Sequence, residues 1–218
     1  MSVHVVIAAR GGPDAKSRCG RNLTSAQRGE LVEAMLADML AAMAGSALID
    51  EICVVTPTAE LGEIARLAGA SVLREARPRG LNAAFTAARR AVVAADPAAL
   101  FAALPGDLPL FERDEFDAVL AQAGEARAVL VPATADGGTG AVIVPAGAPF
   151  AFSFGADSFL AHRAAAVAAG LEPVIVEAAS LGRDIDSPAD LDDLLQRAQD
   201  RRSGRLLRRF QHLREAAL

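Results

Sequence analysis

The sequence predicts an α/β protein in which helices flank a single mixed, mostly parallel sheet. Over about the first 110 residues, short β-branched runs alternate with longer segments of helical spacing. Such alternation indicates right-handed βαβ units, and therefore parallel strands. Beyond that point two apolar runs, 127–133 and 140–146, follow one another around a "TADGGT" turn with no helix between them. This pair favours a mixed sheet in the second half.

The individual elements follow from these patterns. Strands are expected at residues 3–9, 51–56, 70–75, 127–133, 140–146 and 172–178, and at 99–109, where a strand runs into a sharp loop. Helices are expected at residues 59–69, 81–94, 113–123 and 157–170, and over a long charged C-terminal segment from 187 that breaks near Ser203-Gly204. One more helix begins at Thr24, which forms a capping-box pattern with Gln27, and it ends before Gly45.

Composition excludes several classes of protein. A chain of 218 residues with 52% hydrophobic content suits one globular domain. A net charge of -5 and the absence of Trp and Tyr argue against a nucleic-acid partner. No stretch reaches the roughly 18 to 20 uncharged apolar residues of a membrane span, so no membrane partner is expected. The start reaches Arg10 too soon for a signal peptide, which predicts a cytoplasmic protein. Cys19 and Cys53 form neither a disulfide framework nor a zinc set.

The chain is divided into a main domain, 1–200, and a basic helical extension, 201–218. The extension has Leu206, Leu207, Phe210 and Leu213 on one helical face and arginines on the other. That face is expected to pack on its own domain or on a second copy in a homodimer, with a membrane-surface role as a minor alternative.

Ligands of open α/β sheets bind beyond the carboxyl ends of the strands. Four loops are expected there: 10–22, 77–82, 105–109 and 183–187. The first contains Lys16, which is the one lysine among 22 basic residues. Glycines let backbone N–H groups approach an anion, and a lysine adds a compact charge for phosphate oxygens. The loop holds Gly11, Gly12, Lys16, Arg18 and Arg21 but does not match the Walker A pattern, and an ordinary flexible basic surface loop is the alternative.

Two other loops carry acidic residues. Asp107 lies between two prolines in "LPGDLP", just past an apolar strand. Asp184 and Asp186 are two residues apart, so in an extended segment their side chains point the same way. Together the three carboxylates would favour Mg²⁺, which usually also binds substrate phosphates. The alternatives are a tight turn at Asp107 and a helix N-cap at Asp186, with Pro188 in the first turn.

Hydroxyl and glycine residues gather at two further junctions. Thr139, Gly155 and Ser158 could donate hydrogen bonds to an acid or a phosphate. The alternative is a hairpin turn together with a helix N-cap at Asp157 or Ser158. The histidines are interpreted structurally, His162 as a residue of a helix surface and His4 as strand packing.

Several segments carry a family resemblance. In chain order they are "AKSRC", "GLNAAF", "LPGDLPL", "GGTGAVIV", "FSFGADSFLAH" and "RDIDSPADL". They resemble the CofC/FbiD guanylyltransferases of coenzyme F-420 biosynthesis, and the resemblance extends over residues 3–196. It implies a nucleotidyltransferase fold of the GT-A type with a Rossmann-like N-terminal half. It also implies a Mg²⁺-dependent reaction that joins GTP to 2-phospholactate, phosphoenolpyruvate or 3-phosphoglycerate and releases pyrophosphate.

The resemblance also assigns residues. It implies that Asp107, Asp184 and Asp186 hold the metal, and that Lys16 and Asp107 are catalytic. The implied contacts to the acid come from Lys16, Thr139, Gly155 and Ser158, and those to the nucleotide from Ala8, Arg10, Gly11, Gly80, Asn82 and Pro105. The family usually has Asn where Gly140 stands, Lys where Arg10 stands, and bulkier residues at Gly11 and Gly12. Two interpretations compete with this one. The chain could be a related transferase with another acceptor, or a non-catalytic regulator or scaffold.

Overall fold

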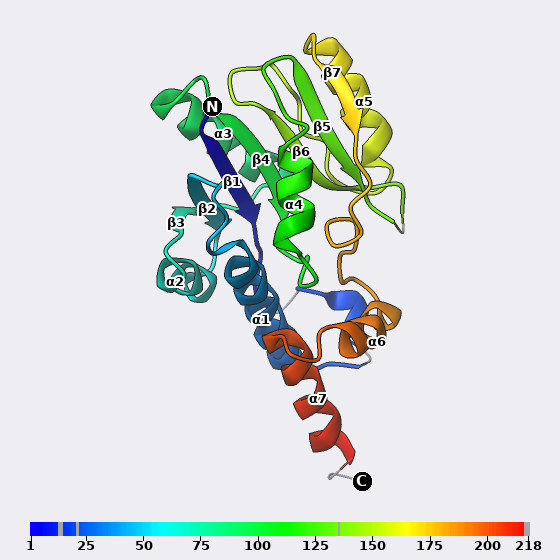
Figure 1. Cartoon of the computed structure of the whole chain (residues 1–218). Coiled ribbons are helices and arrows are strands. Elements are labelled where there is room, and N and C mark those ends of the chain that lie inside the picture. The colour runs from blue at the N-terminus through cyan, green and yellow to red at the C-terminus, as the bar shows by residue number, and fades with distance from the viewer. Residues whose placement is uncertain (13–14, 21, 135, 216–218) are drawn as a thin grey trace.

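A seven-stranded sheet organises the chain, with the strand order β3-β2-β1-β4-β6-β5-β7 (Figure 1). The computed structural model describes residues 1–12, 15–20, 22–134 and 136–215. Strand β6 runs antiparallel to both of its neighbours, and the other strand pairs are parallel. The predicted mixed, mostly parallel sheet is therefore confirmed.

The elements lie close to their predicted positions. The strands are β1 (Val3–Ala8), β2 (Glu51–Thr56), β3 (Ser71–Arg74), β4 (Leu100–Pro105), β5 (Arg127–Pro132), β6 (Thr139–Pro145) and β7 (Glu172–Ile175). The α-helices are α1 (Ser25–Met43), α2 (Ala59–Leu67), α3 (Leu81–Ala95), α4 (Arg113–Leu120), α5 (Ser158–Ala168), α6 (Pro188–Arg197) and α7 (Arg202–Glu215). A short 3-10 helix, η1 (Ser17–Cys19), lies between β1 and α1.

Each face of the sheet has its own hydrophobic cluster. Side chains alternate along a strand, so Val5 and Ile7 of β1 belong to one cluster while Val6 and Ala8 belong to the other. The first cluster includes buried residues of α1, α2, α4, α6 and α7. The second includes residues of α3 and α5, together with three phenylalanines at 150–154. Helices therefore cover both faces of the sheet in a three-layer arrangement.

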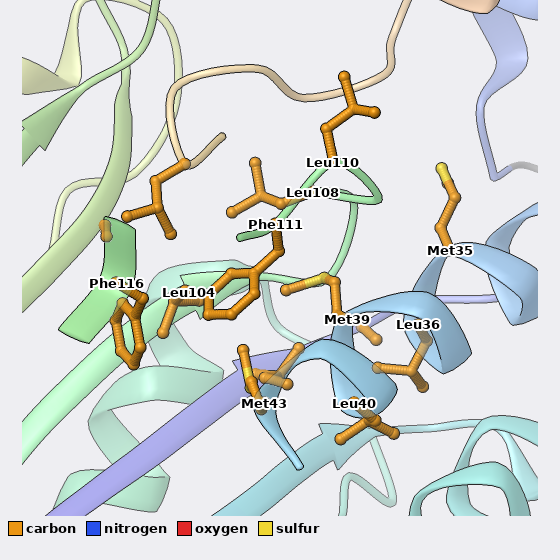
Figure 2. Packing of buried hydrophobic residues seen from close by; sticks show 14 of the residues in the cluster. Met35, Leu36, Met39, Leu40, Met43, Leu104, Leu108, Leu110, Phe111 and Phe116 are labelled. Atoms are coloured by element: carbon orange, nitrogen blue, oxygen red, sulfur yellow. The ribbon is translucent and has the colours of Figure 1, made fainter. Parts of the chain in front are cut away.

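Helix α1 supplies much of the first cluster (Figure 2). Its start is the predicted capping box, in which Thr24 and Gln27 each accept a hydrogen bond from the other's backbone N–H. Met35, Met39 and Met43 follow at helical spacing, and all are buried. Flexible methionine side chains fill irregular gaps well, which suits a helix that packs against loop residues of the 108–111 segment.

The C-terminal segment breaks earlier than predicted. Helix α6 ends at Arg197 and α7 begins at Arg202, whereas the break was expected near Ser203-Gly204. Gly204 lies within α7 and does not break the helix. A Cβ at this position would lie 1.9 Å from the carbonyl oxygen of Ala198. The glycine instead permits a close approach of backbone segments. The Asp38 carboxylate of α1 accepts hydrogen bonds from the backbone N–H groups of Arg202 and Ser203, at 2.8 and 2.9 Å.

Helix α7 packs on its own domain, which was one of the two expected arrangements. Leu207 and Phe210 are buried in the same cluster as the α1 residues. The end of the predicted extension, residues 216–218, lies outside the described residues, and the division of the chain at residue 200 stays a prediction. Among the described helices, none combines the length and hydrophobicity that crossing a bilayer requires.

Candidate functional site

Three acidic side chains meet beyond the carboxyl ends of the strands. Carboxylate oxygens of Asp107, Asp184 and Asp186 all lie within 4.8 Å of one another. Asp107 follows β4, and the other two precede α6. The backbone N–H of Ile185 donates a hydrogen bond to the carbonyl oxygen of Asp107 at 3.3 Å, which ties the two segments together. The geometry therefore brings these carboxylates together as the spacing predicted.

Gly106 positions the loop that carries Asp107. Its backbone N–H donates a hydrogen bond to the Ala8 carbonyl oxygen at 3.0 Å. A Cβ at Gly106 would lie 2.6 Å from the Cβ of Ala9, closer than such atoms can approach. The absence of a side chain at this position lets the loops after β1 and β4 lie side by side.

The capping box of α6 positions Asp186. The N-cap residue is Ser187, and Pro188 occupies the first helical turn. The Asp190 carboxylate accepts hydrogen bonds from the backbone N–H groups of Asp186 and Ser187, at 3.0 and 2.6 Å. The alternative in which Asp186 caps the helix is therefore wrong. Because Ser187 and Asp190 satisfy the helix end, the Asp186 carboxylate remains available to the cluster.

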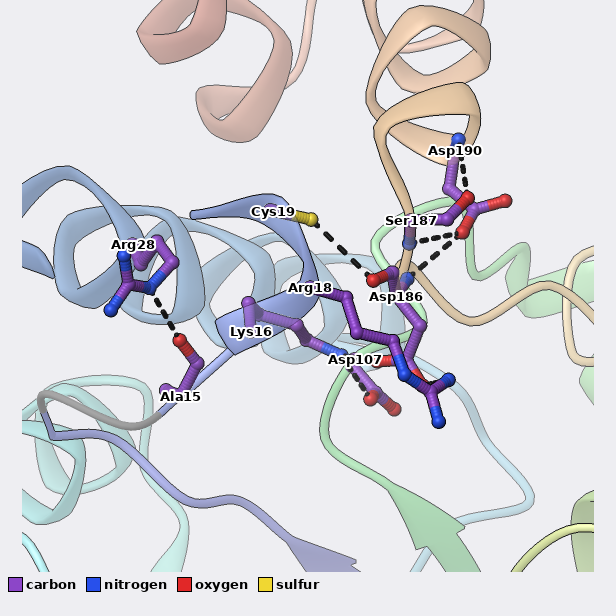
Figure 3. A network of polar contacts seen from close by, with 9 residues as sticks. All are labelled: Ala15, Lys16, Arg18, Cys19, Arg28, Asp107, Asp186, Ser187 and Asp190. Carbon is purple, nitrogen blue, oxygen red and sulfur yellow. Dashed lines mark hydrogen bonds and ion pairs between the residues drawn. The ribbon is translucent and has the colours of Figure 1, made fainter. Parts of the chain in front are cut away.

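Lys16 reaches into the acidic cluster (Figure 3). Its Nζ donates hydrogen bonds to Asp107 Oδ2 at 2.5 Å and to Asp186 Oδ1 at 2.7 Å, and only 8% of the side chain is exposed. Burial alone lowers the pKa of Lys16, but the two carboxylates raise it by more, so the net pKa lies above its ordinary value. Lys16 is thus charged and buried, and the alternative of a flexible surface loop is wrong for this residue.

Neighbouring groups hold the lysine loop in place. Arg28 of α1 donates from Nε to the Ala15 carbonyl oxygen at 2.9 Å, and Cys19 Sγ lies 3.5 Å from the Asp186 carbonyl oxygen. Lys16 itself has φ 51°, a left-handed conformation that is uncommon for a residue with a side chain. Arg21, a residue of the predicted anion-binding loop, lies outside the described residues.

The cluster carries more negative charge than Lys16 neutralises. Burial raises the pKa of the Asp184 carboxyl to about 6, and repulsion from Asp107 and Asp186 adds to that effect. Asp107 Oδ1 is buried and makes no hydrogen bond with any described residue. Hard oxygen donors, excess negative charge and an oxygen without a partner are the features of a divalent-cation site. These residues therefore fit such an ion.

Two cavities adjoin the cluster. The first, of about 250 Å³, is lined by Ala8, Ala9, Arg10, Ala15, Lys16, Val32, Leu81, Pro105, Gly106, Asp107 and Asp186. The second, of about 330 Å³, includes Thr139 and Gly155 in its lining together with all three acidic residues. Leu81, Pro105, Asp107 and Asp186 line both cavities. The carboxylates thus lie between two spaces, each able to hold a small ligand.

Four residues of the predicted site are not part of the described lining of either cavity: Gly11, Gly80, Asn82 and Ser158. Gly11 packs beside Thr58, and Gly80, with φ 108°, precedes α3. Asn82 exchanges two hydrogen bonds with the backbone of Phe154, accepting from its N–H at 2.6 Å and donating to its carbonyl oxygen at 3.2 Å. This pairing ties the start of α3 to the segment before Gly155.

Ser158 and Thr139 meet at the buried start of α5, where their hydroxyl oxygens are 3.0 Å apart. Asp157 occupies the N-cap position of α5 without a side-chain hydrogen bond to the helix. The prediction that His162 lies on a helix surface is wrong, because its side chain is fully buried beside Thr139. The rings of Phe150 and Phe154 enclose this side chain, and a histidine in an otherwise Ala-rich helix carries no sequence signal for burial. His4 lies in β1 and contacts Glu51 at 3.4 Å.

Comparison with known proteins shows which family the chain belongs to. A family model described as guanylyl transferase CofC like matches residues 3–215. The chain belongs to this family. A 3-phospho-D-glycerate guanylyltransferase from Phenylobacterium zucineum is 44% identical to this CofC-like protein, over 93% of this chain and 94% of that one. A phosphoenolpyruvate guanylyltransferase from Rubrobacter xylanophilus is 38% identical, over 88% and 92% of the two chains.

A solved structure agrees on the fold. A protein from Desulfovibrio desulfuricans G20, described as a nucleotide-diphospho-sugar transferase, superposes on this CofC-like protein with a TM-score of 0.76. The two share 17% identity, and the match covers 98% of this chain and 97% of the other. With the named relatives, this identifies the chain as an enzyme of the nucleotidyltransferase type.

Gly140 in this CofC-like protein has a packing role. A Cβ there would lie 1.8 Å from the Leu181 carbonyl oxygen, so the position accommodates the backbone that leads to Asp184. We expect Gly140→Ala to lower the free energy of unfolding by about 2 kcal/mol and to reduce turnover, because the Leu181 segment must shift. Urea denaturation measures the first effect. Gly124→Ala is the control, since no atom lies within 4 Å of a Cβ at Gly124; equal stability of the two variants would contradict the packing role.

Proposed function

We propose that the chain is a Mg²⁺-dependent guanylyltransferase that joins GTP to a phosphorylated three-carbon acid and releases pyrophosphate. Coenzyme F-420 biosynthesis fits membership of the CofC-like family. The observation that carries the proposal is the acidic cluster, with its buried lysine, between two cavities. Two phosphorylated molecules repel one another, so a site that joins them needs positive charge at their meeting point.

The two substrates are assigned to the two cavities. We place the nucleotide in the first cavity, beside Ala8, Arg10 and Pro105. Gly11 and Gly80 would approach it from adjoining loops, and Asn82 from the first turn of α3. The acid occupies the second cavity, near Thr139, Gly155 and Ser158. Lys16 lines the first cavity and pairs with Asp107 and Asp186, which line both cavities, so its charge would lie close to the acid's phosphate where the two substrates meet.

The reaction needs alignment rather than proton transfer. A phosphate oxygen of the acid attacks the α-phosphorus of GTP, a new P–O bond forms, and the bond to the bridging oxygen breaks to release pyrophosphate. This oxygen is already ionised at neutral pH, so no general base is required. When bound, Mg²⁺ would neutralise phosphate charge. Asp107, Asp184 and Asp186 would hold it, and Lys16 would offset the charge that remains.

Two of the candidate acids occur in the names of the relatives. The relative at 44% identity is named for 3-phosphoglycerate, and the one at 38% for phosphoenolpyruvate. We therefore take 3-phosphoglycerate as the first candidate, with phosphoenolpyruvate and 2-phospholactate beside it. A cytoplasmic location and a homodimer stay predictions, as does the absence of nucleic-acid and membrane partners.

The proposal is tested by measuring pyrophosphate release. The purified chain is given GTP, CTP or ATP with Mg²⁺ and each of the three acids. We expect release with GTP and at least one acid, and little with CTP or ATP. Parallel reactions contain sugar phosphates in place of the acids, and release there with CTP instead would support a related transferase with another acceptor. Calorimetric binding of GTP without turnover on any acid would support a regulator and refute the proposal.

A further inference from the structure

His162 lies at the centre of a buried polar chain next to the second cavity. Its side chain is fully buried in α5, and its ring lies between those of Phe150 and Phe154, with centroids 5.8 and 4.8 Å away. Nε2 accepts a hydrogen bond from the backbone N–H of Ser153 at 2.9 Å. Nδ1 lies 2.8 Å from the hydroxyl oxygen of Thr139.

These contacts determine which ring nitrogen carries the hydrogen. A backbone N–H can only donate, so Nε2 must be the acceptor and carries no hydrogen. The neutral ring then has its hydrogen on Nδ1, which donates to Thr139 Oγ1. The ring is neutral at ordinary pH, because burial lowers the pKa of His162 to about 4.

The hydrogens of the His162 ring and of the Thr139 and Ser158 hydroxyl groups can be counted against the contacts between these three side chains. Two contacts connect the three groups, one from His162 to Thr139 and one between Thr139 and Ser158. The first contact uses the histidine hydrogen, and the second uses one of the two hydroxyl hydrogens. One hydroxyl hydrogen therefore remains. With the opposite tautomer, Thr139 would donate to the ring and Ser158 to Thr139, and none would remain.

The remaining hydroxyl hydrogen of the Thr139–Ser158 pair lies next to the second cavity. Thr139 lines the second cavity beside Gly138, Gly140 and Gly155. The Asp136 carboxylate also lines this cavity, and its Oδ1 accepts a hydrogen bond from the backbone N–H of Gly138 at 2.9 Å. Ser158 begins α5, whose N-terminus adds partial positive charge on the same side. Both hydroxyl groups are buried, so a hydroxyl hydrogen that points into this cavity favours an anionic oxygen as its acceptor.

We propose that His162 is a positioning residue for the acid substrate. By donating from Nδ1 to Thr139, it keeps one hydroxyl hydrogen of the Thr139–Ser158 pair directed at an oxyanion in the second cavity. This inference rests on the proposed function, because the acid is the anion concerned. His162 itself does not contact the acid, and it acts through the Thr139 hydroxyl.

The tautomer is tested on the unaltered protein. The chain is labelled with ¹⁵N-histidine, and the ring nitrogens are observed by NMR at pH 7.5. Its other histidines are His4 and His212, so the spectra of His4→Gln and His212→Gln identify the signals of His162 by elimination. We expect a neutral ring with hydrogen on Nδ1. A ring with hydrogen on Nε2, or a charged ring, would overturn the inference.

The coupling to the acid is tested by a double-mutant cycle. In His162→Gln the new amide oxygen can accept from Ser153, but the variant has no donor at the position of Nδ1, so the Thr139 hydroxyl can rotate away from the cavity. We expect the KM for the acid to rise about fivefold to tenfold while the KM for GTP is unchanged. Thr139→Val removes the hydroxyl, and in that background His162→Gln should have no further effect.

The outcomes separate the two proposals. Additive effects of the two substitutions, or equal changes in the KM for GTP and for the acid, would mean that His162 only stabilises the fold and would overturn the inference. The proposed function would stand in that case, because the unaltered enzyme turns over. An unaltered chain that releases no pyrophosphate with any acid would overturn both. Should His162→Gln fail to fold, the NMR result on the unaltered protein decides.

Discussion

Asp184→Asn is expected to reduce pyrophosphate release by about 10³-fold or more, since it removes one charged ligand from the proposed ion site. The amide has nearly the same shape as the carboxylate, so the neighbouring contacts of the 183–187 loop can persist. Steady-state release of pyrophosphate with GTP and 3-phosphoglycerate measures the effect. Asp192→Asn is the matched control, because Asp192 is an exposed residue of α6.

A stability measurement separates loss of the ion site from loss of the fold. Without a bound ion, three carboxylates within 4.8 Å face the Lys16 ammonium and the exposed Arg18 guanidinium, which lies 3.9 Å from Asp186. Negative charge remains in excess, so removing one carboxylate charge relieves repulsion. We expect the Tm of Asp184→Asn in EDTA to equal or exceed that of the unaltered protein. Normal turnover by this variant would remove Asp184 from the site.

Lys16→Ala is expected to lower turnover by about 10²-fold or more, because no other described basic side chain is within hydrogen-bonding distance of both Asp107 and Asp186. The ammonium group is enclosed, with 8% of the side chain exposed. Lys16→Arg should also be poor, since a planar guanidinium is wider than the ammonium and presents its donors in a fixed fork.

The comparison of these two variants distinguishes charge from shape. Full activity of Lys16→Arg would show that any positive charge suffices and would contradict the fit of the ammonium. Arg163→Ala serves as the control, because Arg163 is exposed on α5 and its loss changes net charge by the same amount. Initial rates at saturating GTP and acid are compared for all of these proteins.

The layers of the fold could be predicted because hydrophobic spacing reports directly on burial. Apart from His4, the β1 segment is apolar, as expected of a strand covered on both faces, and the capping box at Thr24 and Gln27 marks the start of α1. The three carboxylates could also be predicted, since parallel strands bring their carboxyl ends to one edge of the sheet. Each of these features is encoded in a short stretch of sequence, so it can be predicted without knowledge of distant contacts.

Other features depend on contacts that no local pattern reports. The break before α7 is set by Asp38, a residue of α1, which caps the backbone at Arg202. The burial of His162 depends on the hairpin that brings Thr139 beside α5. Gly140 is explained only by the Leu181 backbone, which packs against it from a distant part of the chain. In each case the partner is far away in sequence, so spacing could not reveal it.

The most direct test of the account is to measure divalent-ion binding with Mn²⁺, which accepts the same oxygen ligands as Mg²⁺ and is seen by EPR. The unaltered protein, Asp107→Asn and Asp184→Asn are titrated with Mn²⁺ at a fixed GTP concentration, and free Mn²⁺ is measured. The account predicts protein-dependent loss of the free-ion signal for the unaltered chain, with a loss weakened by about tenfold or more in each variant. Equal binding by all three proteins would contradict it.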